Sequence, residues 1–363
     1  MVFNRDLHVI ETRPLLSPAF IKSEFPLTES MAQLVTQTRS RIRNILEGKD
    51  QRILVVVGPC SIHDVEAAEE YGQKLVKLRS RFADTLEIVM RVYFEKPRTT
   101  VGWKGLINDP HLNNSYDINT GLRIARKLLL DLASIGLPAA TELLDPITPQ
   151  YIADLICWTA IGARTTESQI HRQMASGLSM PVGYKNGTDG SFAAAINAML
   201  TAKISHHFLG INQDGLASIV KTTGNPDGHL VLRGGAAKPN YEATDIKAAT
   251  DALKQKAMNS HLMIDCSHGN SSKDYNKQSV VLNSISQQIE AGCSNIIGVM
   301  IESHLVEGNQ SISQNKNELV YGNSITDACV SWDSTEIMLQ SLAEAVAKGR
   351  PGIKQNMASA VGK

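Results

Sequence analysis

Short apolar, β-branched runs alternate with helical stretches along most of this chain, and this alternation constrains the fold more than any other feature. The runs are ILVVVG (53–58), EIVMRVYF (87–94), LPAATEL (137–143), CWTAIGAR (157–164), MPVGYK (180–185), SHHFLG (205–210), LMIDCS (262–267) and NIIGVMIES (295–303). Helical spacing follows over 64–82, 117–135, 191–203, 273–291 and 333–348. Eight strand–helix units predict an α/β fold, a (β/α)8 TIM barrel. An open doubly wound sheet shares the alternation and is the competing topology.

Three segments lie outside this repeating pattern. Residues 1–48 form an N-terminal arm, interrupted by Pro14, Pro18 and Pro26, and a helix predicted from Thr28 to Leu46. The barrel is expected over 49–350, with a C-terminal tail at 351–363. Residues 211–235 alternate apolar and polar side chains around Asp-Gly turns, which predicts an inserted β-ribbon after strand six.

The charge balance and the cysteines limit the class of protein. Lys plus Arg and Asp plus Glu are 36 each, so we expect no nucleic-acid partner and no membrane partner. The first residues lack a long apolar run and carry acidic residues early, so we expect neither a signal peptide nor a membrane span there. Five cysteines without a CxxC pair indicate thiols in a reducing compartment, and we expect a cytoplasmic protein.

Cationic residues stand just past several predicted strands, where barrel enzymes carry their reactive groups. They are Arg91, Lys96, Arg98, Arg164, Lys185 and, at the end of the expected ribbon, Arg233. Such a ring repels itself unless anions fill it, and Arg forks suit phosphate and carboxylate. The pattern predicts a site for small phosphorylated anions. The alternative is a set of solvated loop cations, some paired with nearby acids.

A second set of residues past the strands has the chemistry of metal ligands. Cys60, His268, Glu302 and Asp327 offer a thiolate, an imidazole and two carboxylates, which suit a first-row divalent ion. They are scattered in sequence, so no spacing motif supports them. The alternative is a buried cysteine, a hydrogen-bonded loop histidine and two ion-paired or capping carboxylates.

Around these residues the chain resembles the type I 3-deoxy-D-arabino-heptulosonate-7-phosphate (DAHP) synthases, in their feedback-regulated microbial branch. The matching stretches run from about residue 5 to 348 and include VVVGPCSIHD, MRVYFEKPRTTVGWKG, ATELLDP, IGARTTESQ, VGYKNGTDG, VLRGG, MIDCSHGNSSKD, GVMIESHLVEGNQ and SITDAC. The resemblance implies a metal-dependent barrel that joins phosphoenolpyruvate to erythrose 4-phosphate, the first step of the shikimate pathway. It also implies a homodimer or homotetramer built through a regulatory N-terminal arm.

The resemblance assigns roles residue by residue. It implies one divalent ion per subunit (manganese, iron, cobalt or zinc) on Cys60, His268, Glu302 and Asp327. It implies substrate contacts from Arg91, Lys96, Pro97, Arg98, Thr99, Glu142, Arg164, Lys185 and Arg233. Of these, Arg164, Lys185 and Arg233 would hold the phosphate of phosphoenolpyruvate, Arg91 with Lys185 would face its carboxylate, and Arg98 and Thr99, beside Pro97, would bind the sugar phosphate. The catalytic residues are expected to be Lys96, His268 and Asp327, with Lys96 as the proton donor to the aldehyde oxygen.

Feedback inhibition by an aromatic amino acid is also implied by the resemblance. The expected effector residues are Pro149, Met174, Leu178, Ser179, Phe208 and Gly210. Phenylalanine-sensitive relatives tend to carry Ser at the position of Gly210, so tyrosine is favoured over phenylalanine. Core packing explains the apolar members of this set equally well.

Three other functions compete with this one. A related synthase uses arabinose 5-phosphate, but the KPRTT loop, the arm and the ribbon match the present family. A Schiff-base aldolase on Lys185 predicts an adduct that borohydride traps. A non-catalytic barrel that senses aromatic amino acids has no need to retain four ligand types and six cations.

Overall fold

Eight parallel strands close into a barrel in the computed structural model, which describes residues 5–313 and 318–350. They are β1 (Ile53–Gly58), β2 (Leu86–Arg91), β3 (Ala139–Glu142), β4 (Ile156–Ile161), β5 (Val182–Lys185), β8 (Gly228–Leu232), β9 (Leu262–Asp265) and β10 (Ile296–Glu302). The ring order β1-β10-β9-β8-β5-β4-β3-β2 confirms the predicted TIM barrel and excludes the open sheet, because β1 pairs with both β2 and β10. The predicted tail, 351–363, lies outside the described residues.

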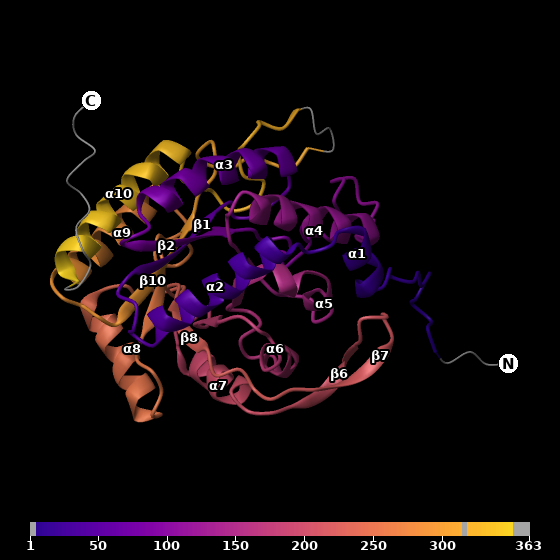
Figure 1. Ribbon diagram of the computed structural model, residues 1–363, viewed down its shortest axis with the longest axis horizontal. Coiled ribbons are helices and arrows are strands. Elements are labelled where there is room, and N and C mark those ends of the chain that lie inside the picture. The colour runs from indigo at the N-terminus through magenta and orange to yellow at the C-terminus, as the bar shows by residue number, and fades with distance from the viewer. Residues whose placement is uncertain (1–4, 314–317, 351–363) are drawn as a thin grey trace.

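Helices surround the strands, as Figure 1 shows. They are α3 (Val65–Arg81), α4 (Ile118–Ser134), α5 (Pro149–Ile152) with the 3-10 turn η1 (Ala153–Leu155), α6 (Gln169–Ala175), α7 (Ala193–Ala202), α8 (Ala243–Gln255), α9 (Lys277–Glu290) and α10 (Trp332–Gly349). The side chains of Asp64 and Asp117 accept a hydrogen bond from a backbone N–H in the first turn of α3 and of α4. Each of these aspartates therefore caps the helix that follows it. None of the helices in the described part of the chain is long and apolar enough to cross a membrane.

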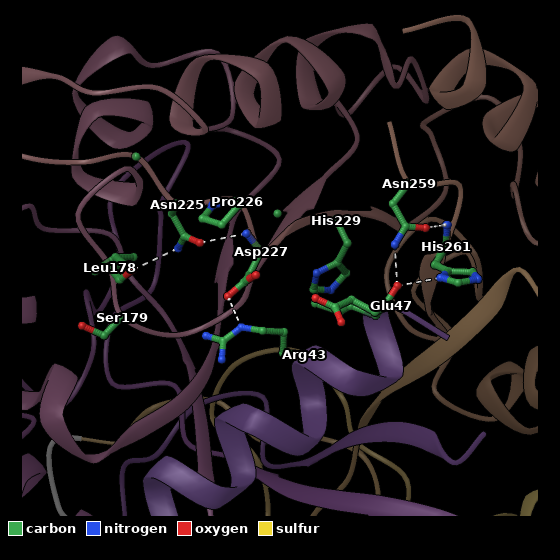
Figure 2. A pocket seen from close by; sticks show the side chains of 13 residues that line it. Arg43, Glu47, Leu178, Ser179, Asn225, Pro226, Asp227, His229, Asn259 and His261 are labelled. Atoms are coloured by element: carbon green, nitrogen blue, oxygen red, sulfur yellow. Dashed lines mark hydrogen bonds and ion pairs between the residues drawn. The ribbon is translucent and has the colours of Figure 1, made fainter. Parts of the chain in front are cut away.

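The amino end of the barrel is closed by α2 (Glu29–Leu46), the helix predicted from residue 28. Ile42 and Ile45 are fully buried and pack with interior residues of the barrel such as Trp158. Figure 2 shows how the end of the helix is held: Arg43 forms an ion pair with Asp227 at 2.7 Å, just before β8. This plug leaves the carboxyl end of the strands as the open face.

The two-stranded ribbon is real, but its predicted position is wrong. β6 (His207–Ile211) and β7 (Ala217–Lys221) pair only with each other and precede the sixth barrel strand, β8. The run SHHFLG, predicted as a barrel strand, therefore belongs to the ribbon, and the run before Arg233, predicted as ribbon, is the sixth barrel strand. Burial explains the difference: β8 is covered along nearly its whole length, whereas alternate residues of β6 and β7 face solvent.

The arm also differs from expectation, because it contains a short helix, α1 (Pro18–Glu24). Pro18 occupies the first helical turn, where a missing N–H costs nothing, and Ser17 caps it. The ribbon turn docks on this helix, with Ala19 N donating to Gln213 O at 2.8 Å. Figure 1 shows the ribbon reaching away from the barrel toward α1.

Candidate active site at the carboxyl end of the barrel

Three of the four predicted metal ligands meet at the open end of the barrel. Cys60 follows β1, Glu302 ends β10, and Asp327 comes from the loop before α10. One possible ligand atom from each residue lies within 4.8 Å of the other two. Among the described residues, these three side chains form the group of potential ligands that lie so close together. Cys60 and Glu302 are fully buried, while Asp327 is exposed. A thiol and two carboxylates at this separation fit a first-row divalent ion.

Glu302 is held rigidly by its neighbours. Its carboxylate accepts from Arg91 at 2.8 Å and from Ser267 at 2.7 Å, and its backbone N–H and C=O both bond the Gln278 side chain. Burial alone raises the pKa of Glu302, but the positive charges of His268 and Arg91 outweigh it and lower the pKa to about 2. Glu302 therefore stays ionised, as a ligand must be.

His268, the fourth predicted ligand, stands at the edge of this group. Its Nε2 is 3.7 Å from Glu302 Oε1, and its Nδ1 is 2.9 Å from Asp265 Oδ2. Its backbone is left-handed, with φ of 57°, which is uncommon for a residue with a side chain. Lys273 N donates to the His268 carbonyl at 2.8 Å and holds that conformation. Strained backbone of this kind gathers at functional sites.

Lys96 connects the ligand group to the cationic residues. Its Nζ lies 3.1 Å from Cys60 Sγ and 3.3 Å from the Cys60 carbonyl oxygen. Burial lowers the pKa of Lys96, but the charges of Cys60 and Glu302 more than reverse this, so its pKa lies above the ordinary value. The buried Tyr93 ring adds to the site: Arg91 stacks on it at 3.4 Å, with Lys96 and Lys185 each 6.0 Å from its centroid.

The predicted substrate-binding residues line one cavity beside this group. Its lining includes Arg91, Lys96, Pro97, Arg98, Glu142, Arg164, Lys185 and Arg233, together with His268, Lys273 and Asp327. Thr99 joins it through Arg164, whose Nε donates to Thr99 Oγ1 at 3.0 Å. The lining thus carries many cations against few carboxylates, which suits an anionic ligand.

Arg91 is less available to a ligand than the sequence suggested. Its side chain is 1% exposed, and its guanidinium contacts Pro59 O, Cys60 O, Glu302 and Met300 Sδ. Arg91 is therefore mainly the ion-pair partner of Glu302, and it contributes a positive charge at the floor of the cavity.

Several residues of the site were not predicted from the sequence. Asp265 ends β9 fully buried, with Oδ2 3.0 Å from Lys185 Nζ as well as 2.9 Å from His268 Nδ1. These cations outweigh the effect of burial and hold the pKa of Asp265 well below its ordinary value. An acidic residue that closes the apolar run LMID was the available signal, because a lone carboxylate at a strand end has no apolar role. Tyr93 and Ser267 gave no comparable signal.

The predicted effector residues lie around the ribbon and the nearby helices. Phe208 and Gly210 are on the half-buried face of β6, Pro149 starts α5, and Met174 is buried in α6. Gln150, next to Pro149, accepts from the Gln213 side chain in the ribbon turn. Leu178 and Ser179 border a cavity of about 530 Å³ at the closed end of the barrel, shown in Figure 2. The other four predicted effector residues do not line this cavity.

Comparison with known proteins gives a consistent result. The model of the DAHP synthetase I family matches residues 25–340. The chain is 56% identical over 349 residues to the Phe-sensitive phospho-2-dehydro-3-deoxyheptonate aldolase of Escherichia coli K12, covering 96% of this chain and 99% of that protein. It is 54% identical over 337 residues to the Tyr-sensitive enzyme of the same strain, covering 93% and 94%. The solved structure of phospho-2-dehydro-3-deoxyheptonate aldolase from Francisella tularensis superposes with a TM-score of 0.92 at 51% identity, covering 94% of this chain and 99% of that one.

Proposed function

The chain belongs to the DAHP synthetase I family and is a 3-deoxy-7-phosphoheptulonate synthase, and from this premise we propose how its barrel mouth carries out the reaction. Phosphoenolpyruvate, D-erythrose 4-phosphate and water combine to give DAHP and inorganic phosphate. The observation that carries the proposal is the meeting of Cys60, Glu302 and Asp327 beside a cavity lined with arginine and lysine.

In this reaction the methylene carbon of phosphoenolpyruvate bonds to the aldehyde carbon, and water adds to the neighbouring carbon. The carbon–oxygen bond to the phosphate then breaks. Arg164, Lys185 and Arg233 hold the phosphate of phosphoenolpyruvate, while Arg91 and Lys185 supply charge toward its carboxylate. Arg98 and Thr99, beside Pro97, hold the sugar phosphate. The 3.0 Å bond between Arg164 and Thr99 supports this arrangement, because it joins the two anion-binding groups. Fixed cations that place both reactants together supply much of the rate by positioning.

Cys60, Glu302 and Asp327, joined by His268, would hold a divalent ion, and we infer that manganese, iron, cobalt or zinc is that ion. When bound, the ion supplies a Lewis acid that stabilises negative charge on the aldehyde oxygen. Lys96, next to Cys60 Sγ, donates the proton to that oxygen. His268 and Asp327 border the same cavity: His268 acts there as a metal ligand, Asp327 takes up a proton of the attacking water, and Glu142 orients the substrate.

A turnover assay with the two substrates tests this function. We expect one phosphate released per DAHP formed, loss of turnover in a chelator, and recovery on adding manganese or zinc. Borohydride added with substrate is expected to leave the enzyme active, since the metal route forms no Schiff base on Lys185. A trapped Lys185 adduct, or full turnover in chelator, would contradict the proposal.

We further infer that an aromatic amino acid regulates the enzyme, with tyrosine favoured. Relatives sensitive to tyrosine and to phenylalanine are about equally similar to this chain, so the argument rests on residues. An added Cβ at Gly210 would lie 2.7 Å from Val220 Cγ2, so any larger residue there has to displace the Val220 side chain on the half-buried face of the ribbon. Glycine at this position therefore leaves that face less crowded, which suits the larger effector, tyrosine. Inhibition assays with tyrosine, phenylalanine and tryptophan test it, and phenylalanine acting at far lower concentration would refute it.

A homodimer or homotetramer is the assembly we propose, built through the arm and the ribbon. Leu209 and Ile219 pair directly on the outer face of the ribbon and are 89% and 78% exposed, and Ile10 in the arm is fully exposed. An exposed apolar pair such as Leu209 and Ile219 is of the kind found at interfaces. Light scattering on Leu209→Asp is expected to show smaller particles than the wild type, and an unchanged mass would count against the ribbon as an interface.

The cytoplasm is the compartment we propose. All five cysteines are free thiols, and four of them, including Cys60, are buried. A Cys60 disulfide would remove a metal ligand, so a reducing compartment suits the site.

A further inference from the structure

One buried carboxylate, Asp265, lies between the metal ligands and the phosphate-binding cations. It ends β9 and has no exposed surface. Its Oδ1 accepts from Ser267 N at 3.0 Å, while its Oδ2 is 3.0 Å from Lys185 Nζ and 2.9 Å from His268 Nδ1. A buried carboxylate is costly unless compensated, so the ammonium group of Lys185 and the hydrogen bond from Ser267 N are what make this position tolerable.

The contact with His268 is close but not yet aligned. Among the described residues, neither Asp265 Oδ2 nor His268 Nδ1 makes a hydrogen bond of regular geometry, although the two atoms are 2.9 Å apart. The other ring nitrogen, Nε2, is the one that faces Glu302 Oε1. Because the His268 backbone is held by Lys273 N, rotation of the imidazole is the movement that aligns Nδ1–H with Asp265.

We propose that Asp265 is a positioning residue that fixes the tautomer and direction of His268 for the metal and, through the same carboxylate oxygen, links the metal site to Lys185 in the phosphoenolpyruvate site. The inference rests on the proposed function. An imidazole whose Nδ1–H is held by a carboxylate presents Nε2 as a stronger and better directed ligand.

Because Lys185 and His268 share one oxygen of Asp265, the two sites are interdependent. When a substrate anion draws the charge of Lys185, Asp265 has His268 as its remaining close partner, and its interaction with the imidazole strengthens. Phosphoenolpyruvate then tightens metal binding. By thermodynamic linkage, metal tightens phosphoenolpyruvate binding by the same factor.

Asp265→Asn tests this, because it keeps the size of the side chain and removes its charge. Metal-free protein is titrated with zinc against a chromophoric chelator, with and without phosphoenolpyruvate. We expect zinc affinity about 10- to 100-fold below the wild type, and a smaller strengthening by phosphoenolpyruvate. Asp227→Asn is the matched control: it removes a carboxylate paired with Arg43 at the closed end of the barrel, and is expected to leave zinc affinity unchanged. Unchanged zinc affinity in Asp265→Asn would overturn the proposal.

A double-mutant comparison separates positioning from general damage. In a His268→Gln background, Asp265→Asn is expected to add little further loss of zinc affinity, since the ring it positions is gone. Losses that simply add would show that Asp265 acts on the fold and not through His268. The absorption spectrum of the cobalt-loaded protein gives a readout independent of turnover, and we expect Asp265→Asn to shift it. Failure of the wild type to bind zinc would instead sink the proposed function.

Discussion

Replacing Arg91 by methionine tests whether the acidic ligand group is stable only because buried cations compensate it. The Arg91–Glu302 pair is 2.8 Å long, with the two side chains 1% and 0% exposed. Removing one partner of such a pair costs about 3–5 kcal/mol, because the other charge stays buried and uncompensated. Unfolding entropy of about 2.1 cal/mol/K per residue gives roughly 0.8 kcal/mol/K for the 363-residue chain, so the cost corresponds to a fall in Tm of about 4–7 °C.

The assay is calorimetry on metal-free protein, repeated after adding manganese or zinc. We expect the ion to restore part of the lost stability in Arg91→Met, because it brings positive charge back to Glu302. Arg41→Met is the control: Arg41 pairs with the buried Glu87 at 2.8 Å, but Glu87 keeps Arg52 at 2.8 Å and Arg79 at 3.3 Å. This control is expected to lose less stability and to respond to metal as the wild type does. Equal losses in both variants, or no extra response of Arg91→Met to metal, would refute the reasoning.

Three further outcomes follow from single positions. Lys96→Met is expected to bind phosphoenolpyruvate and zinc normally yet lose turnover by about 10²–10⁴, the usual contribution of a general acid; near-normal turnover would rule out Lys96. Gly210→Ser is expected to weaken inhibition by tyrosine about tenfold, because the added side chain has to displace Val220, and to improve inhibition by phenylalanine; an unchanged preference would exclude Gly210 as its cause. Burial lowers the pKa of His229 to about 3. Below pH 6.5 the unfolded chain therefore binds a proton at His229 that the folded chain does not bind. Stability is therefore full above pH 6.5 and falls as pH drops toward 3, by roughly 1 kcal/mol between pH 6.5 and 5.5. Urea unfolding at both values should show this share missing in His229→Gln, and an equal pH dependence would contradict it.

The barrel was predictable because its strands are buried on both sides and read as apolar runs, of which ILVVVG is the clearest. The sixth strand was not predictable by this rule. Burial alternates along HFLGI, because one face of the ribbon is exposed, and is nearly continuous along GHLVL. The two sequences do not carry this difference, because Leu209 is apolar and yet exposed. The short helix at Pro18 was not predicted, because proline interrupts the interior of a helix but is tolerated in its first turn.

The site was predictable to the extent that parallel strands end at a common face. That rule alone brings Cys60, Glu302 and the cations to one mouth, whatever their separation in sequence. It does not give the directions of side chains. Arg91 follows the rule, yet it lies beneath the cavity and forms an ion pair with Glu302. A buried carboxylate requires such a partner, whereas a substrate in water does not.

Asp265 shows the limit from the other side. In sequence it is one acid at the end of one strand, with His268 three residues later, while Lys185 lies two barrel strands earlier in the chain. Only the parallel pairing of β5 with β8 and of β8 with β9 brings Lys185 to the same oxygen as His268. The property that most distinguishes this site from a set of separate ligands and cations, a carboxylate held in common, is therefore a product of the register between strands. Strand-end patterns can locate such a site, but the coupling within it has to be argued from the distances between atoms.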